Sequence, residues 1–134
     1  MIVDLISFSF KNKELPDANY IIDVRFLNNP FYVDELRVLT GLDKNVIDFF
    51  AKDQKTQTFL KELCKWIEYV LKLNKQSYRD KREKVKIAIG CTGGHHRSPY
   101  VVEKLAKYLI KKKLASEISI YHDELKKYNV TIPS

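Results

Sequence analysis

Residues 90–99 read Gly-Cys-Thr-Gly-Gly-His-His-Arg-Ser-Pro and stand between the apolar run Val85–Ile89 and a run with helical periodicity. This order predicts a strand, a glycine-containing turn and the first turn of a helix. Ser98 followed by Pro99 is typical of a helix start, because serine caps a free N–H and proline suits the first helical position. A helix start directs backbone N–H groups and a positive dipole end at one small volume. The sequence therefore predicts an anion site there, with phosphate as the favoured anion.

Apolar spacing predicts the elements before this turn. Alternation over Ile2–Phe10 and the β-branched and aromatic residues of Asn19–Phe26 predict two strands. Residues 31–42 follow no regular pattern, so we expect a loop that folds over the site. Asp43 is a suitable N-cap for a short helix, and apolar residues three and four apart over Phe59–Leu71 predict a core helix.

The elements after the turn complete an alternating pattern. The helix that starts at Ser98 runs to a basic end at Lys111–Lys113, and Glu117–Tyr121 has the composition of a last strand. We expect residues 126–134 to be loosely held. Interleaved strands and helices predict an α/β fold, a single three-layer domain over residues 1–134 with helices packed on a small mixed β-sheet.

Composition limits the class of protein and the kind of partner. The 134 residues are 45% apolar, which is enough for one buried core. The 24 lysines and arginines exceed the 17 acidic residues and give a net charge of +7, which favours anionic partners. Cys64 and Cys91 lie in unrelated settings, so we expect no disulfide and a cytoplasmic location. The first residues do not resemble a signal peptide, and no apolar run has the length of a membrane span.

The residues of the turn alone leave three interpretations open. In the first, Gly93 and Gly94 only permit a tight turn. In the second, Cys91, Arg97 and Ser98 match the Cys-x5-Arg-Ser/Thr loop of protein tyrosine phosphatases, in which a thiolate attacks phosphorus. Such chemistry also needs a general acid, and no aspartate of the chain is singled out for it. In the third, the turn is a non-catalytic phosphate receptor.

Four segments of the chain, in this order and at compatible spacing, closely resemble the C-terminal domain of the RapZ family of RNase adapter proteins: Ser7–Lys11, Asp23–Tyr32, Glu35–Asp43 and Ala88–Ser98. The resemblance implies a domain that binds glucosamine-6-phosphate without catalysis. In the enterobacterial adapter, the domain also binds small RNAs and an endoribonuclease. An RNA-binding adapter without a metabolite ligand is a further alternative.

The resemblance also implies which residues contact the sugar phosphate. Arg97 and His96 would neutralise the phosphate, residues 29–31 would form the opposite wall, and Asp23 or Asn29 would face the amino sugar. The full set of candidate ligand-binding residues is Asp23, Arg25, Asn29, Phe31, Cys91, Thr92, Gly93, Gly94, His96, Arg97 and Ser98. In this set Cys91 shapes the pocket and need not be a nucleophile.

The chain departs from the family pattern at defined positions. Phe31 stands where the enterobacterial pocket has a histidine, position 95 is His rather than Lys or Arg, and position 99 is Pro. The sequence has no G-x-x-x-x-G-K-S/T run, so we expect no nucleotide hydrolysis.

Partners and cofactors follow from charge and from the residue types present. Candidate contacts to RNA phosphates are Lys11, Arg37, Lys126 and Lys127. Another protein and a second copy of the chain remain open as partners. No metal or cofactor is expected, because the adjacent His95 and His96 cannot readily share one ion with Cys91 in a tight loop.

Overall fold

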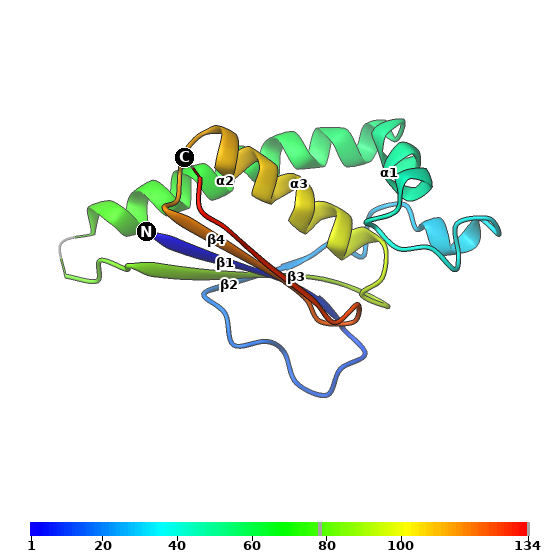
Figure 1. Ribbon diagram of the computed structural model, residues 1–134, viewed down its shortest axis with the longest axis horizontal. Coiled ribbons are helices and arrows are strands. Elements are labelled where there is room, and N and C mark those ends of the chain that lie inside the picture. The colour runs from blue at the N-terminus through cyan, green and yellow to red at the C-terminus, as the bar shows by residue number, and fades with distance from the viewer. Residues whose placement is uncertain (78, 134) are drawn as a thin grey trace.

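The computed structural model describes residues 1–77 and 79–133 and folds them around a five-stranded sheet (Figure 1). Strands β1 to β4 are mutually parallel in the order β2-β3-β1-β4, and β5 pairs antiparallel with β4 at the edge. The elements in chain order are β1 (Ile2–Ser9), β2 (Tyr20–Asp23), the short 3₁₀ helix η1 (Pro30–Tyr32), α1 (Lys44–Ala51), α2 (Gln54–Gln76), β3 (Lys84–Cys91), α3 (Arg97–Lys111), β4 (Glu117–His122) and β5 (Lys127–Thr131). The expected α/β fold, a mixed sheet with helices packed on it, is confirmed.

The helices share one face of the sheet. From β2 to β3, and again from β3 to β4, the chain moves in the same direction across the sheet. Right-handed crossovers that move in one direction lie on one face, so α2 and α3 cover the same side (Figure 1). The connection 10–19 moves the opposite way and runs along the other side (Figure 1). The third layer is therefore this connection rather than a helix.

The core lies between the sheet and the two long helices. Val3 and Leu5 of β1 point to the helix side and are fully buried, as are Val101 and Leu105 of α3. Helix α3 packs directly on β1, β3 and β4, and α2 packs against α3. The core helix expected from apolar spacing is confirmed, and it extends over all of α2. Within the described ranges, no helix combines the length and the apolar character that crossing a bilayer requires.

Two expectations about element ends are wrong. Helix α3 begins at Arg97 with His96 at the N-cap, and the Ser98 hydroxyl instead lies 3.2 Å from the thiol of Cys91. The Ser98 hydroxyl is engaged inside the core, where it contacts Cys91 and donates to the carbonyl oxygen of Phe8 at 3.4 Å. Residues 127–131, expected to be loosely held, form β5 because their backbone groups pair with β4.

Candidate anion-binding site

The turn between β3 and α3 presents free backbone donors. Residues 92–96 lie outside both elements, at the carboxyl ends of the parallel strands. In residues 1–77 and 79–133, no protein group accepts a hydrogen bond from any backbone N–H of 92–96. Gly94 has a φ of 72°, a left-handed conformation that favours glycine. Successive free N–H groups beside a helix start form a concavity suited to an anion.

Arg97 places a buried positive charge beside these donors. Arg97 is only 5% exposed to solvent. One terminal nitrogen donates to the carbonyl oxygens of Arg25 and Leu27, and the other lies 3.3 Å from the Thr92 hydroxyl. Its Nε is buried without a partner, and no carboxylate of the described residues forms an ion pair with it. Arg97 is close enough to Asp23 to help lower the pKa of that carboxyl, but it has no direct ion pair. A buried cation without a direct counter-charge is costly, so an anionic ligand would be favoured here.

These groups line a cleft with a volume of about 1000 Å³. The cleft lies at the carboxyl ends of β1 and β3, where the connections that follow these two strands leave toward opposite faces of the sheet. Ligand sites in open α/β sheets usually lie at such a position. It is lined by Ser9, Lys11, Arg25, Leu27, Asn28, Asn29, Phe31, Tyr32, Arg37, Cys91, Thr92, Gly93, His95, His96, Arg97 and Glu124. Four of these side chains are lysine or arginine and one is a carboxylate, so the lining is predominantly basic.

His96 holds the far wall of the cleft in place. Its Nε2 lies 3.1 Å from the carbonyl oxygen of Leu36, while the Gly41 N–H donates to the His95 carbonyl over 2.8 Å. Burial lowers the pKa of His96 below its ordinary value, so the neutral ring is favoured. His96 therefore positions the 36–41 segment, and the buried charge of the site comes from Arg97.

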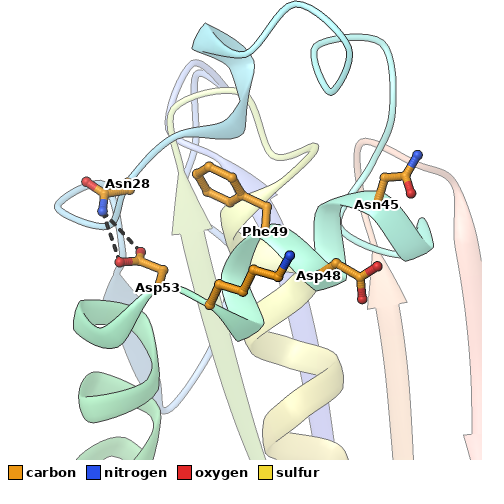
Figure 2. Close-up of a pocket in the computed structure, with 6 residues that line it drawn as sticks. Asn28, Asn45, Asp48, Phe49 and Asp53 are labelled. Atoms are coloured by element: carbon orange, nitrogen blue, oxygen red, sulfur yellow. Dashed lines mark hydrogen bonds between the residues drawn. The ribbon is translucent and has the colours of Figure 1, made fainter.

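A separate hollow of about 610 Å³ lies beside the cleft, against α1 (Figure 2). It is lined by Asn28, Asn45, Asp48, Phe49, Lys52 and Asp53. Asn28 belongs to both hollows, and its amide donates to both carboxylate oxygens of Asp53 over 3.1 Å (Figure 2). This contact holds the segment that begins at Asn28 against Asp53, the N-cap residue of α2.

Comparison with known proteins gives the family. Residues 1–126 match the sequence profile of the RapZ C-terminal domain. The chain belongs to this family. A nucleotide-binding protein of Lactobacillus acidophilus is 42% identical to this RapZ-type domain over 127 residues, 94% of the chain and 41% of the relative. A nucleotide-binding protein of Glaesserella parasuis is 43% identical over 125 residues, 93% of the chain and 42% of the relative. The chain thus spans about two-fifths of the length of these curated relatives.

The RapZ-type fold brings most of the expected ligand-binding residues into the cleft. Those that line it are Arg25, Asn29, Phe31, Cys91, Thr92, Gly93, His96 and Arg97. Gly94, Ser98 and Asp23 do not line it. Gly94, within the turn, and Ser98, in the first turn of α3, are both buried. The Asp23 carboxylate faces the Arg25 guanidinium at 2.7 Å, and hydrogen bonding from Arg25 is the main cause that lowers the pKa of Asp23. The Asp23 carboxylate is therefore paired with the Arg25 guanidinium and does not line the cleft.

The expected RNA contacts fall into two separate places. Lys11 and Arg37 line the cleft, whereas Lys126 and Lys127 lie at the turn into β5. Sequence reasoning also missed Ser9, Leu27, Asn28, Tyr32, His95 and Glu124 as lining residues. Most of them are neighbours of residues that the sequence did single out. Glu124 is the exception in its origin, because the pairing of β4 with β1 brings the turn after β4 to the cleft.

Proposed function

We propose that the cleft binds a phosphorylated amino sugar, of which glucosamine-6-phosphate is the reference ligand, without catalysing a reaction on it. The observation that carries the proposal is the buried guanidinium of Arg97, which has a donor without a partner and no carboxylate counter-charge among the described residues. A dianionic phosphate in the cleft would supply the missing charge and form charge-assisted hydrogen bonds there. A regulatory role, in which ligand binding controls a protein or RNA partner, accords with the family.

The lining supports a division between phosphate and sugar. The phosphate would accept from free N–H groups of the turn residues that line the cleft and from Arg97, with the Thr92 hydroxyl beside them. The sugar would extend toward Asn29 and Phe31. Asn29 uses its side-chain oxygen to accept from the Phe31 N–H at 3.1 Å, which leaves its amide group able to donate to a sugar oxygen. Phe31 is 47% exposed, with the Arg37 guanidinium 5.1 Å from the centre of its ring, so part of the ring is available to a sugar.

Isothermal titration calorimetry tests this proposal directly. The titrants are glucosamine-6-phosphate, glucosamine, inorganic phosphate and AMP, the last because relatives are named nucleotide-binding proteins. We expect the sugar phosphate to bind most tightly and glucosamine not to bind. Replacing Arg97 with Lys removes the planar multidentate donor set and should weaken binding about tenfold or more. Arg82→Lys, at an exposed arginine before β3, is the matched control. Absence of binding, or equal binding by the Arg97 variant, contradicts the proposal.

A phosphatase is the second candidate, since Cys91 lines the same cleft and its sulfur accepts from the Ser98 N–H at 3.4 Å. A thiolate nucleophile also needs an acid, and the nearby Asp23 is occupied by Arg25. Hydrolysis of an aryl phosphate that is abolished in Cys91→Ser would establish this activity. The receptor proposal instead expects no turnover, and sugar-phosphate binding that survives Cys91→Ser.

A further inference from the structure

Glu124 is the acidic residue of an otherwise basic cleft. It lies in the turn between β4 and β5, is partly buried, and lines the cleft. Its side chain leans over the anion-binding turn: a Cβ on Gly94 would come within 2.6 Å of the Glu124 Cγ. The missing side chain at Gly94 is thus what allows Glu124 to sit against the turn.

The Glu124 carboxylate has no partner among the described residues, neither a hydrogen bond nor an ion pair. Its neighbours differ in this respect. Asp123 accepts from Asn12 at 3.1 Å and lies 3.7 Å from Lys126. Asp23 is bound by Arg25 at 2.7 Å. Glu124 therefore keeps its full capacity to bind a donor that enters the cleft.

A free carboxylate beside a phosphate site has an electrostatic consequence. Two negative groups in a partly buried cleft repel each other, because the local dielectric screens them less than water does. A neutral hydroxyl can donate to Glu124 but does not cancel this repulsion. A cationic group on the ligand cancels it and forms a charge-assisted hydrogen bond.

We propose that Glu124 binds the ammonium group of the ligand and selects amino sugar phosphates over their neutral analogues. This inference rests on the proposed function, because it assigns the second charged end of the same ligand. The role that sequence reasoning gave to Asp23 or Asn29 thus passes to Glu124. The phosphate end remains with the turn and Arg97.

Calorimetric titration of Glu124→Gln tests the inference. The ligands are glucosamine-6-phosphate, glucose-6-phosphate, N-acetylglucosamine-6-phosphate and inorganic phosphate. We expect the variant to bind glucosamine-6-phosphate about tenfold more weakly, from the loss of one charge-assisted contact. The other three ligands should bind equally or more tightly, because the repulsion is removed. Asp123→Asn, the same change at the adjacent position, should leave all four affinities unchanged.

Different failures overturn different claims. If glucosamine-6-phosphate binds in an Arg97-dependent manner and Glu124→Gln leaves its affinity unchanged, the ammonium assignment alone is overturned. If the variant weakens glucose-6-phosphate equally, Glu124 contacts hydroxyl groups and the assignment is again overturned. If neither phosphate nor any sugar phosphate binds the wild-type protein, the proposed function falls and this inference falls with it. Far-ultraviolet circular dichroism and the melting temperature show that each variant is folded.

Discussion

The guanidinium of Arg97, in the first turn of α3, donates to the carbonyl oxygen of Leu27 over 3.2 Å, although 70 positions separate the two residues. The same group also donates to the carbonyl oxygen of Arg25. The Arg97 side chain thus holds the segment 25–27 against the cleft and carries the buried charge of the anion site. Ligand binding and folding should therefore be coupled through Arg97.

The first prediction follows from this coupling. Inorganic phosphate should raise the melting temperature of the wild-type protein, because an anion relieves the uncompensated charge of Arg97 only in the folded state. A ligand at about 100 times its Kd raises the free energy of unfolding by about 2.7 kcal/mol. Thermal unfolding followed by circular dichroism, with increasing phosphate at constant ionic strength, measures the shift.

Arg97→Lys is the informative variant for this experiment, and chloride is the control anion. The variant should show a much smaller shift with phosphate, since a lysine cannot provide the same fork of donors. An equal shift in both proteins, or an equal shift with chloride, would mean that phosphate acts by a general salt effect.

The second prediction concerns the two glycines of the turn. Gly94→Ala should destabilise the fold by about 1–2 kcal/mol or more, because alanine is strained at a left-handed φ. In addition, the new Cβ would come within 3.1 Å of the Ser9 backbone nitrogen. Gly93 provides the comparison, since a Cβ there would meet only the His95 ring at 3.5 Å. Gly93→Ala should therefore cost far less.

Urea unfolding at equilibrium compares these two variants. The decisive quantity is the difference between their free energies of unfolding, with the m-value checked for constancy. Similar losses in the two variants would refute the claim that Gly94 alone is required by backbone geometry.

The sequence predicts the parts of the fold that depend on local pattern. Asp43 occupies the N-cap position of α1 as expected, although its carboxylate accepts from the Thr40 N–H and not from the helix, and the strand expected over Glu117–Tyr121 is β4. Apolar period and turn residues suffice for such elements. The pattern fails at Ser98, where a contact with Cys91 outweighs the local preference for an N-cap. That contact depends on burial behind β1, which local spacing does not encode.

The candidate site divides in the same way. The segment from Cys91 to Arg97 could be identified because its donors are consecutive in the chain. The hydrogen bonds from Arg97 to the carbonyl oxygens of Arg25 and Leu27, and the position of Glu124 against Gly94, depend on strand order. The sequence indicates parallel strands but not that β1 lies between β3 and β4. Assignment of the amino-sugar contact to Asp23 therefore missed its pairing with Arg25.

The third prediction concerns the pH dependence of stability. Burial lowers the pKa of His96 in the folded protein from its ordinary value of 6.5. As the pH falls through about 6.5, the unfolded chain takes up a proton that the folded chain resists, so the free energy of unfolding decreases. His96→Gln cannot titrate but can still donate to the Leu36 carbonyl, and its stability should fall less over the same range.

Urea unfolding between about pH 7.5 and pH 5.5 measures this difference. His95→Gln, a change at the exposed neighbour whose charge contributes to the lowered pKa of His96, is the comparison and should reduce the slope less than His96→Gln does. Identical slopes for the wild type and His96→Gln would show that the buried ring does not resist protonation.

The fourth prediction tests RNA as a partner. Lys11 and Arg37 line the same cleft as the anion-binding turn, so we expect RNA and a sugar phosphate to compete. The logarithm of RNA affinity should fall linearly with the logarithm of salt concentration, with a slope of about one for each phosphate contacted. Replacing both Lys11 and Arg37 with alanine should reduce that slope by about two. Fluorescence anisotropy with a labelled single-stranded RNA measures the slope with and without glucosamine-6-phosphate.

The matched variant for this last experiment replaces both Lys126 and Lys127 with alanine. These two lysines lie at the turn into β5 and do not line the cleft. If RNA and the sugar phosphate compete in the cleft, glucosamine-6-phosphate should still lower the RNA affinity of this variant by the same factor as in the wild type, whatever the pair itself contributes to RNA affinity. If RNA affinity depends only on Lys126 and Lys127 and is insensitive to glucosamine-6-phosphate, RNA binds a separate surface. In that case the cleft would be free to bind its ligand while RNA is bound, and the two would meet only through the β4–β5 turn, in which Glu124 lies two positions before Lys126.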